Sequence, residues 1–181
     1  IIDTASANFN PLVISGTTIN LPDDRLSSLI PLGFSFDFFG NSYSQLYISS
    51  NGFVTFNNDN DDGCCAGQLL PSSGTPNNLI ALNWADLDPM LNGTIRYQTL
   101  GSSPNQKWVL NFNDVANYNG SNVTTQLIIY ETTNKIEIHT LSSSTTGTTV
   151  GIENQNGTEA YVYPSRNNST FLASNDYVSF T

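Results

Sequence analysis

The sequence predicts an all-β protein, an antiparallel β-sandwich of the jelly-roll type with little or no helix. Two observations support this prediction. Short runs of β-branched and aromatic residues alternate with polar residues, and Gly, Asn and Pro separate the runs at close spacing. No window places apolar residues at the i, i+3, i+4, i+7 spacing of an amphipathic helix. Closely spaced short strands are typical of sandwiches and barrels.

The first expected hairpin lies in the first third of the chain. Leu46–Ile48 and Phe53–Phe56 are β-forming runs on either side of Ser49–Gly52. An Asn-Gly pair between β-forming runs, as at Asn51-Gly52, is the strongest short-range signal for a hairpin.

A further strand is expected at Lys107–Phe112, where alternation places Trp108, Leu110 and Phe112 on one face. These three side chains are large and apolar, so we expect that face to be buried in the core.

The next expected hairpin joins Thr124–Tyr130 to Lys135–Leu141. In its second arm Ile136 and Ile138 share one face, which leaves His139 on the opposite, polar face. No nucleophile motif accompanies this lone histidine, so we expect it to be an exposed strand residue.

The C-terminal part of the chain predicts one more hairpin and a closing strand. Thr149–Glu153 and Glu159–Tyr163 flank a turn at Asn154–Gly157, and Tyr177–Thr181 has the pattern of a final strand.

Length and composition predict a single domain over residues 1–181, which we expect to be a piece of a larger multidomain surface protein. The net charge is −10, with only five Lys and Arg residues, which argues against nucleic acid as a partner. No apolar run approaches the roughly 20 residues of a membrane span, so direct membrane insertion is not expected. Polarity supplied mainly by Asn, Ser, Thr and Gly is typical of secreted proteins.

An acidic loop is the first candidate site. Asn57–Asp62 offers six consecutive side chains with oxygen ligands of the kind that calcium prefers, and we take Asp59, Asp61 and Asp62 as candidate calcium ligands. An EF-hand is excluded because Leu69 stands where the bidentate Glu would be required. The alternative is a solvated loop tip in which Asn and Asp form turns.

A second candidate is the segment Trp84–Asp88. If it is extended, Asp86 and Asp88 lie on one face within about 7 Å of each other. Such a pair can cap backbone amides before Pro89, bind calcium, or serve acid-base chemistry as in a glycoside hydrolase. We rank these three roles in that order.

The only two cysteines, Cys64 and Cys65, are adjacent. Two cysteines cannot form a disulfide framework, and with one histidine they do not make a four-ligand zinc site. In a secreted protein two adjacent exposed thiols tend to oxidise, so we expect a vicinal disulfide; the alternative is two free thiols. The disulfide would form a rigid, apolar projection at the loop tip, suited to stacking on a sugar or an aromatic ring.

Three segments resemble the nidogen-like (NIDO) domain, especially its version in large secreted or cell-surface adhesins of Bacteroidetes. They are Ile30–Gly40, Tyr47–Phe56 and Asn78–Asp88, and weaker similarity at Gly93–Tyr97 and Val150–Asn154 extends the resemblance over about residues 25–181.

The resemblance implies a non-enzymatic extracellular adhesion module, and the bacterial relatives have a stretch similar to Cys64–Gly67 in the same loop. We therefore expect a glycan or another surface ligand to contact Cys64, Cys65, Gly67, Gln68 and Trp84. The first alternative is a calcium-stabilised spacer domain with no ligand of its own. A more distant one is a glycoside hydrolase that uses the carboxylates of the second candidate site.

Overall fold

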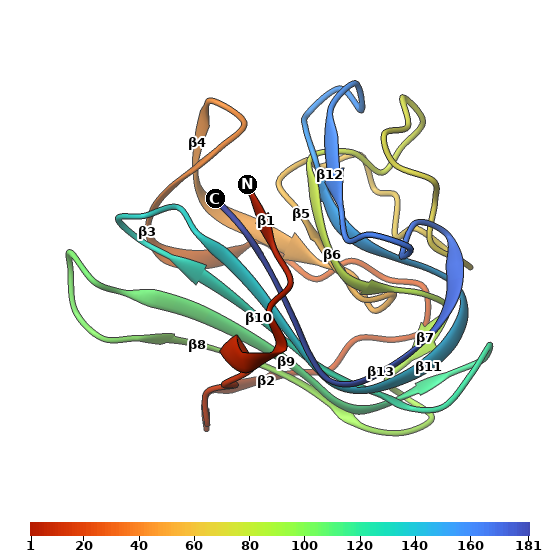
Figure 1. Ribbon diagram of the computed structural model, residues 1–181. Helices are drawn as coiled ribbons and strands as arrows, with labels where there is room; N and C mark the ends of the chain where they lie inside the picture. Colours follow the sequence, from red (N-terminus) through yellow and green to blue (C-terminus); the bar gives the residue numbers. More distant parts are fainter.

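The structure is a computed structural model that describes all residues from 1 to 181 (Figure 1). It contains strands and one short 3-10 turn, η1. In chain order the elements are β1 (Ile2–Asp3), η1 (Ser6–Asn8), β2 (Thr17–Ile19), β3 (Ile30–Phe38), β4 (Asn41–Ile48), β5 (Phe53–Thr55), β6 (Leu79–Trp84), β7 (Leu87–Asp88), β8 (Thr94–Leu100), β9 (Lys107–Asn117), β10 (Val123–Tyr130), β11 (Ile136–Glu153), β12 (Ala160–Val162) and β13 (Ser169–Phe180).

The strands form one strongly curled antiparallel sheet that folds over into two layers, a sandwich or half-barrel (Figure 1). The first layer is β2-β8-β9-β10-β11, with β13 beside β11 and β1 beside β13. The second layer is β3-β4-β5-β6, with β12 beside the far half of β11. The predicted all-β antiparallel class is therefore confirmed.

Strand β11 belongs to both layers. Its first half pairs with β10 and its last residues pair with β6. The register against β13 shifts between Thr145 and Thr148, where Gly147 has a φ of +66°. A bulge bends a strand and increases its twist, so this interruption lets one strand continue into the second layer. The sequence predicted two separate strands here because the Ser- and Thr-rich stretch between them carries no apolar alternation.

The core lies between the layers, and β3 shows how alternation builds it. Ile30, Leu32, Phe34, Phe36 and Phe38 are all buried, and the residues between them are all exposed. One cluster of 27 buried apolar residues joins both layers. As predicted from their spacing, the three apolar side chains at 108, 110 and 112 of β9 belong to it.

The three predicted hairpins are confirmed. Tyr47 pairs with Thr55 in the first, Leu127 with Ile138 in the second and Ile152 with Tyr161 in the third. The predicted closing strand is present but begins earlier, because β13 pairs with β11 along most of its length.

The expectation that His139 is exposed was wrong. Its side chain does point away from the core isoleucines, but it is only 1% exposed. The N-terminal segment crosses this face: the Asn10 N–H donates to His139 Nδ1 at 3.2 Å, and the Phe9 ring lies 5.8 Å from the imidazole. Alternation along a strand predicts which way a side chain points, but it does not predict that a segment distant in sequence, here the N-terminal one, covers that side chain.

Candidate functional site

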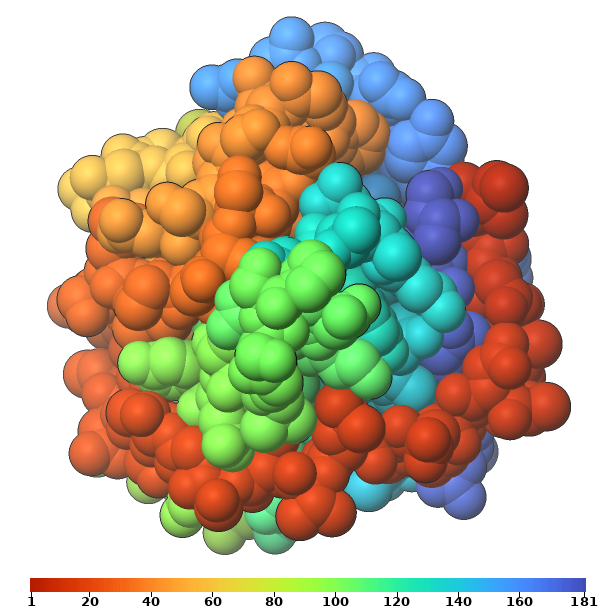
Figure 2. Space-filling model, turned by 90° about the vertical axis from the view of Figure 1, so that its left-hand side faces the viewer, coloured from red at the N-terminus to blue at the C-terminus, as the bar shows by residue number.

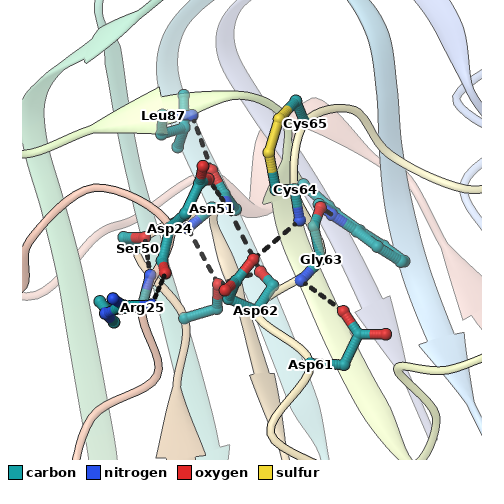
Figure 3. Close-up of a disulfide and its surroundings, with 12 residues drawn as sticks. Asp24, Arg25, Ser50, Asn51, Asp61, Asp62, Gly63, Cys64, Cys65 and Leu87 are labelled. Atoms are coloured by element: carbon teal, nitrogen blue, oxygen red, sulfur yellow. Dashed lines mark hydrogen bonds between the residues drawn. A yellow bond between two sulfur atoms is a disulfide. The ribbon is translucent and has the colours of Figure 1, made fainter.

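The two cysteines lie in the long loop between β5 and β6, and the turn Ser49–Gly52 holds its first half. The hydroxyl of Ser49 donates to the carbonyl of Asp62 at 2.7 Å. The buried Asn51 side chain accepts from the Leu87 N–H at 3.0 Å and donates to an Asp24 carboxylate oxygen at 2.9 Å. The Asn-Gly turn therefore closes a hairpin and also ties the loop to β7 (Figure 3).

Cys64 and Cys65 form a disulfide, as predicted, and the peptide bond between them is cis. Both residues are exposed, as is the next residue, Ala66, whereas Gly63 and Gly67 on either side are buried. Figure 3 shows the sulfur–sulfur bond projecting from the loop above Asp62.

The two buried glycines anchor this projection. Gly63 has a φ of +73°, and a Cβ there would meet the Phe53 ring at 2.6 Å. A Cβ on Gly67 would meet the Thr149 nitrogen at 2.6 Å, and the Gly67 N–H donates to the Gly147 carbonyl at 2.8 Å. The loop thus packs directly on the bend of β11, so the disulfide stands on a fixed base.

Trp84 is not at the surface, where contact with a ligand would require its ring to be. Its side chain is completely buried, packs on Phe53 at 5.0 Å between ring centroids, and donates from Nε1 to the Gly63 carbonyl at 2.8 Å. A fully buried ring cannot stack on a ligand at the surface, so Trp84 supports the loop from beneath. Alternation alone could not show this, because β6 is buried on both faces.

Gln68 is half-buried at the edge of the exposed tip. Its Nε2 donates to the Thr75 carbonyl at 3.0 Å, and its own carbonyl accepts from the Thr149 hydroxyl at 2.6 Å. These bonds join the tip to β11 and to the second half of the loop.

The predicted calcium ligands of the loop do not converge on one point. Asp61 and Asp62 accept from the backbone N–H groups of Gly63 and Cys64, at 2.9 and 3.1 Å (Figure 3). This is the turn-forming use of Asp that was the alternative for this loop. Asp59 belongs to no group of three converging metal ligands.

Asp88 caps a backbone amide, the role ranked first for the segment Trp84–Asp88. Asp88 is buried, and its two oxygens accept from the Met90 N–H at 2.8 Å and from the Tyr118 hydroxyl at 2.9 Å. Asp86 lies close to Asp23 and Asp24, and oxygens of these three carboxylates are within 4.8 Å of one another. Asp88 is also near enough to raise the pKa of Asp86. The segment is not a regular strand at this point, because β6 ends before Asp86 and β7 begins after it.

Like charges accumulate in this acidic trio of Asp23, Asp24 and Asp86. Burial, followed by the neighbouring carboxylates, raises the pKa of Asp86 and of Asp23. The hydrogen bond to Asp88 raises the pKa of Tyr118 to about 12. Sequence reasoning missed Asp23 and Asp24, which lie about sixty positions before Asp86 and share no motif with it.

The trio adjoins the disulfide. Asp24 also lies with both cysteine sulfurs in a group whose ligand atoms are within 4.8 Å of one another. Tyr118, 55% exposed, donates its backbone N–H to the Asp86 carbonyl at 3.0 Å. One surface therefore combines an apolar disulfide, an aromatic ring and several carboxylates; we call it the disulfide surface.

The fold and this surface define an all-β domain that displays a vicinal disulfide on a loop attached to the sheet by hydrogen bonds and packing. The family model described as NIDO related matches residues 1–180, so the chain belongs to the NIDO-related family. Domains of this family are typically extracellular. No curated protein and no solved structure matches the chain. The structure contains no helix long and apolar enough to cross a membrane.

Proposed function

We propose that this domain is a non-enzymatic adhesion module of a bacterial cell-surface protein that contacts glycans through the disulfide surface. The observation that carries the proposal is the exposed Cys64–Cys65 disulfide between two buried, closely packed glycines. Binding through a preformed surface costs little conformational entropy, which favours a contact role for this loop.

The chemistry of the disulfide surface supports a glycan as the ligand. A sugar presents an apolar face of C–H groups and a rim of hydroxyls. The disulfide and the exposed Tyr118 ring offer apolar area, and the carboxylates of Asp24 and Asp86 can accept hydrogen bonds from hydroxyls. Contact of this kind is weak for one domain, and repetition in a larger protein would supply avidity.

Glycan-array binding tests the proposal with the variant Cys64→Ser/Cys65→Ser. We expect binding to fall at least tenfold while the melting temperature changes little, because the bond closes a minimal loop and removes little chain entropy. The matched control is Leu172→Ser, which removes an apolar side chain that is 78% exposed on β13. Unchanged binding by the double variant would rule out the disulfide as the contact.

A second candidate function is a calcium-stabilised spacer, and the acidic trio favours it. The carboxylates of Asp23, Asp24 and Asp86 lie close together, and the pKa values of Asp86 and Asp23 are raised by burial and then by neighbouring carboxylates. A bound cation would relieve the repulsion among them. This candidate places calcium at Asp23, Asp24 and Asp86 and leaves Asp59, Asp61 and Asp62 in their roles within the loop.

A further inference from the structure

Both lysines and the only histidine of the chain line one cavity. The cavity has a volume of about 250 Å³ and lies on the outer face of the first layer, away from the core. Figure 2 shows the N-terminal segment (red) running beside the C-terminal strand and below the turn between β10 and β11 (cyan). The cavity lies among these segments, and its lining includes Asn8, Asn10, Lys107, Tyr130, Lys135, Glu137, His139 and Tyr177.

Glu137 organises the floor of the cavity. Its carboxylate accepts from Lys135 Nζ at 2.7 Å, from the Tyr130 hydroxyl at 2.7 Å and from the Tyr177 hydroxyl at 3.2 Å. Burial opposes ionisation, but hydrogen bonds from His139, Lys135 and Tyr130 outweigh it and lower the pKa of Glu137 to about 2. Its negative charge is therefore already matched by the ammonium of Lys135.

His139 completes this floor as a fixed donor. Because its Nδ1 accepts from the Asn10 N–H, the ring hydrogen lies on Nε2, which is 3.2 Å from a Glu137 oxygen. Four donors thus converge on one carboxylate, and the floor is a preformed polar network.

No carboxylate of the protein forms a salt bridge with the ammonium of Lys107. Its Nζ lies 4.9 Å from the centroid of the Tyr130 ring. The neighbouring Asn10 is exposed, and its side-chain amide makes no hydrogen bond. In a chain of net charge −10, this cavity therefore offers one ammonium without a carboxylate partner and one side-chain amide without a hydrogen-bond partner.

We propose that this cavity binds a small hydroxylated carboxylate, such as a hexuronate. The ligand carboxylate would pair with Lys107, and its hydroxyls would exchange hydrogen bonds with the Asn10 amide. A monoanion matches the single free charge, whereas a dianion such as phosphate would bring a second charge into a half-buried site without a partner. The walls are mostly polar, which suits a sugar acid better than an apolar acid.

Calorimetric titration of the whole domain with glucuronate and galacturonate tests this proposal, with glucose and sulfate as comparison probes. We expect saturable binding of a hexuronate with a Kd of about 1 mM or below, and much weaker binding of glucose and sulfate. Lys107→Gln should weaken binding at least tenfold, and Lys107→Arg should retain it. Arg96→Gln is the matched control, since it removes an exposed cation from β8, outside the cavity.

A second variant keeps the test decisive if Lys107→Gln does not fold. Asn10→Asp places a negative charge at the exposed rim and should also weaken hexuronate binding, while Cys64→Ser/Cys65→Ser should leave it unchanged. Equal binding of glucose and hexuronate, equal binding of sulfate, full binding by Lys107→Gln, or no saturable binding by the wild type would each overturn the proposal.

Discussion

Gly63 is the residue that most directly fixes the position of the disulfide. Its backbone adopts the left-handed region, and its missing Cβ leaves room for Phe53 and Trp84. The Trp84 indole also donates to the Gly63 carbonyl, so a buried aromatic side chain helps to fix the position of the exposed loop. Substitution here should disturb the loop without touching the cysteines.

Gly63→Ala is expected to destabilise the domain by about 2 kcal/mol or more, because it adds both backbone strain and a clash. Urea unfolding measures this. Gly40→Ala is the matched control: Gly40 has a φ of +79°, but no atom lies within 4 Å of its added Cβ. It should cost about 1 kcal/mol, from strain alone. Equal losses for the two variants would show that the packing against Phe53 does not constrain Gly63.

At the scale of elements, β11 carries the second half of the cysteine loop. Glu153, at the end of β11, is fully buried and accepts from the Ser72 N–H at 2.6 Å. Burial raises the pKa of Glu153 to about 7, although the Ser72 hydrogen bond acts in the opposite direction. Ionisation of Glu153 near neutral pH therefore places a charge in the protein interior, which destabilises the folded domain.

The sign of the resulting pH dependence follows from linkage. The folded state binds this proton more tightly than the unfolded chain, so the contribution is full below about pH 4.5 and is lost as pH rises through about 7. We expect the free energy of unfolding to fall by about 2 kcal/mol between pH 5 and pH 8. Glu137 does not contribute to this window, because its lowered pKa affects stability only in more acidic solution.

Glu153→Gln should abolish most of this decrease, since its carbonyl oxygen can still accept from Ser72 but carries no charge. Urea unfolding at pH 5 and pH 8 compares the two proteins. Glu159→Gln, at an exposed carboxylate beside β12, serves as the control and should retain the wild-type difference. A decrease of the same size in Glu153→Gln would contradict the assignment to Glu153.

At the scale of the whole molecule, features that depend on neighbouring residues could be predicted from the sequence, whereas contacts between distant segments could not. The Asn51-Gly52 turn, the alternation of β9 and the disulfide each depend on neighbouring residues, and the structure has all three. The acidic trio and the cover over His139 depend on segments that are far apart in the sequence. No pattern within one segment predicts such contacts, so Asp23 and Asp24 were missed as neighbours of Asp86, and His139 was wrongly predicted to be exposed.

Calcium dependence is a property of the whole domain, because the trio joins the segment before β3 to the segment between β6 and β7. If calcium binds there, adding it in millimolar excess to EDTA-treated protein should raise the melting temperature by about 5 °C. Asp86→Asn should remove the shift, and Asp61→Asn should keep it. A melting temperature that is the same in calcium and in EDTA would contradict this candidate.

The central claim is that ligands contact the exposed disulfide between Gly63 and Gln68. Chemical-shift mapping on ¹⁵N-labelled domain, titrated with the glycan that ranks first on the array, tests it most directly. We predict that the largest backbone amide shifts occur at residues 63–68 and at Tyr118. Shifts confined to the Lys107 cavity or to another face, with residues 63–68 unmoved, would contradict it.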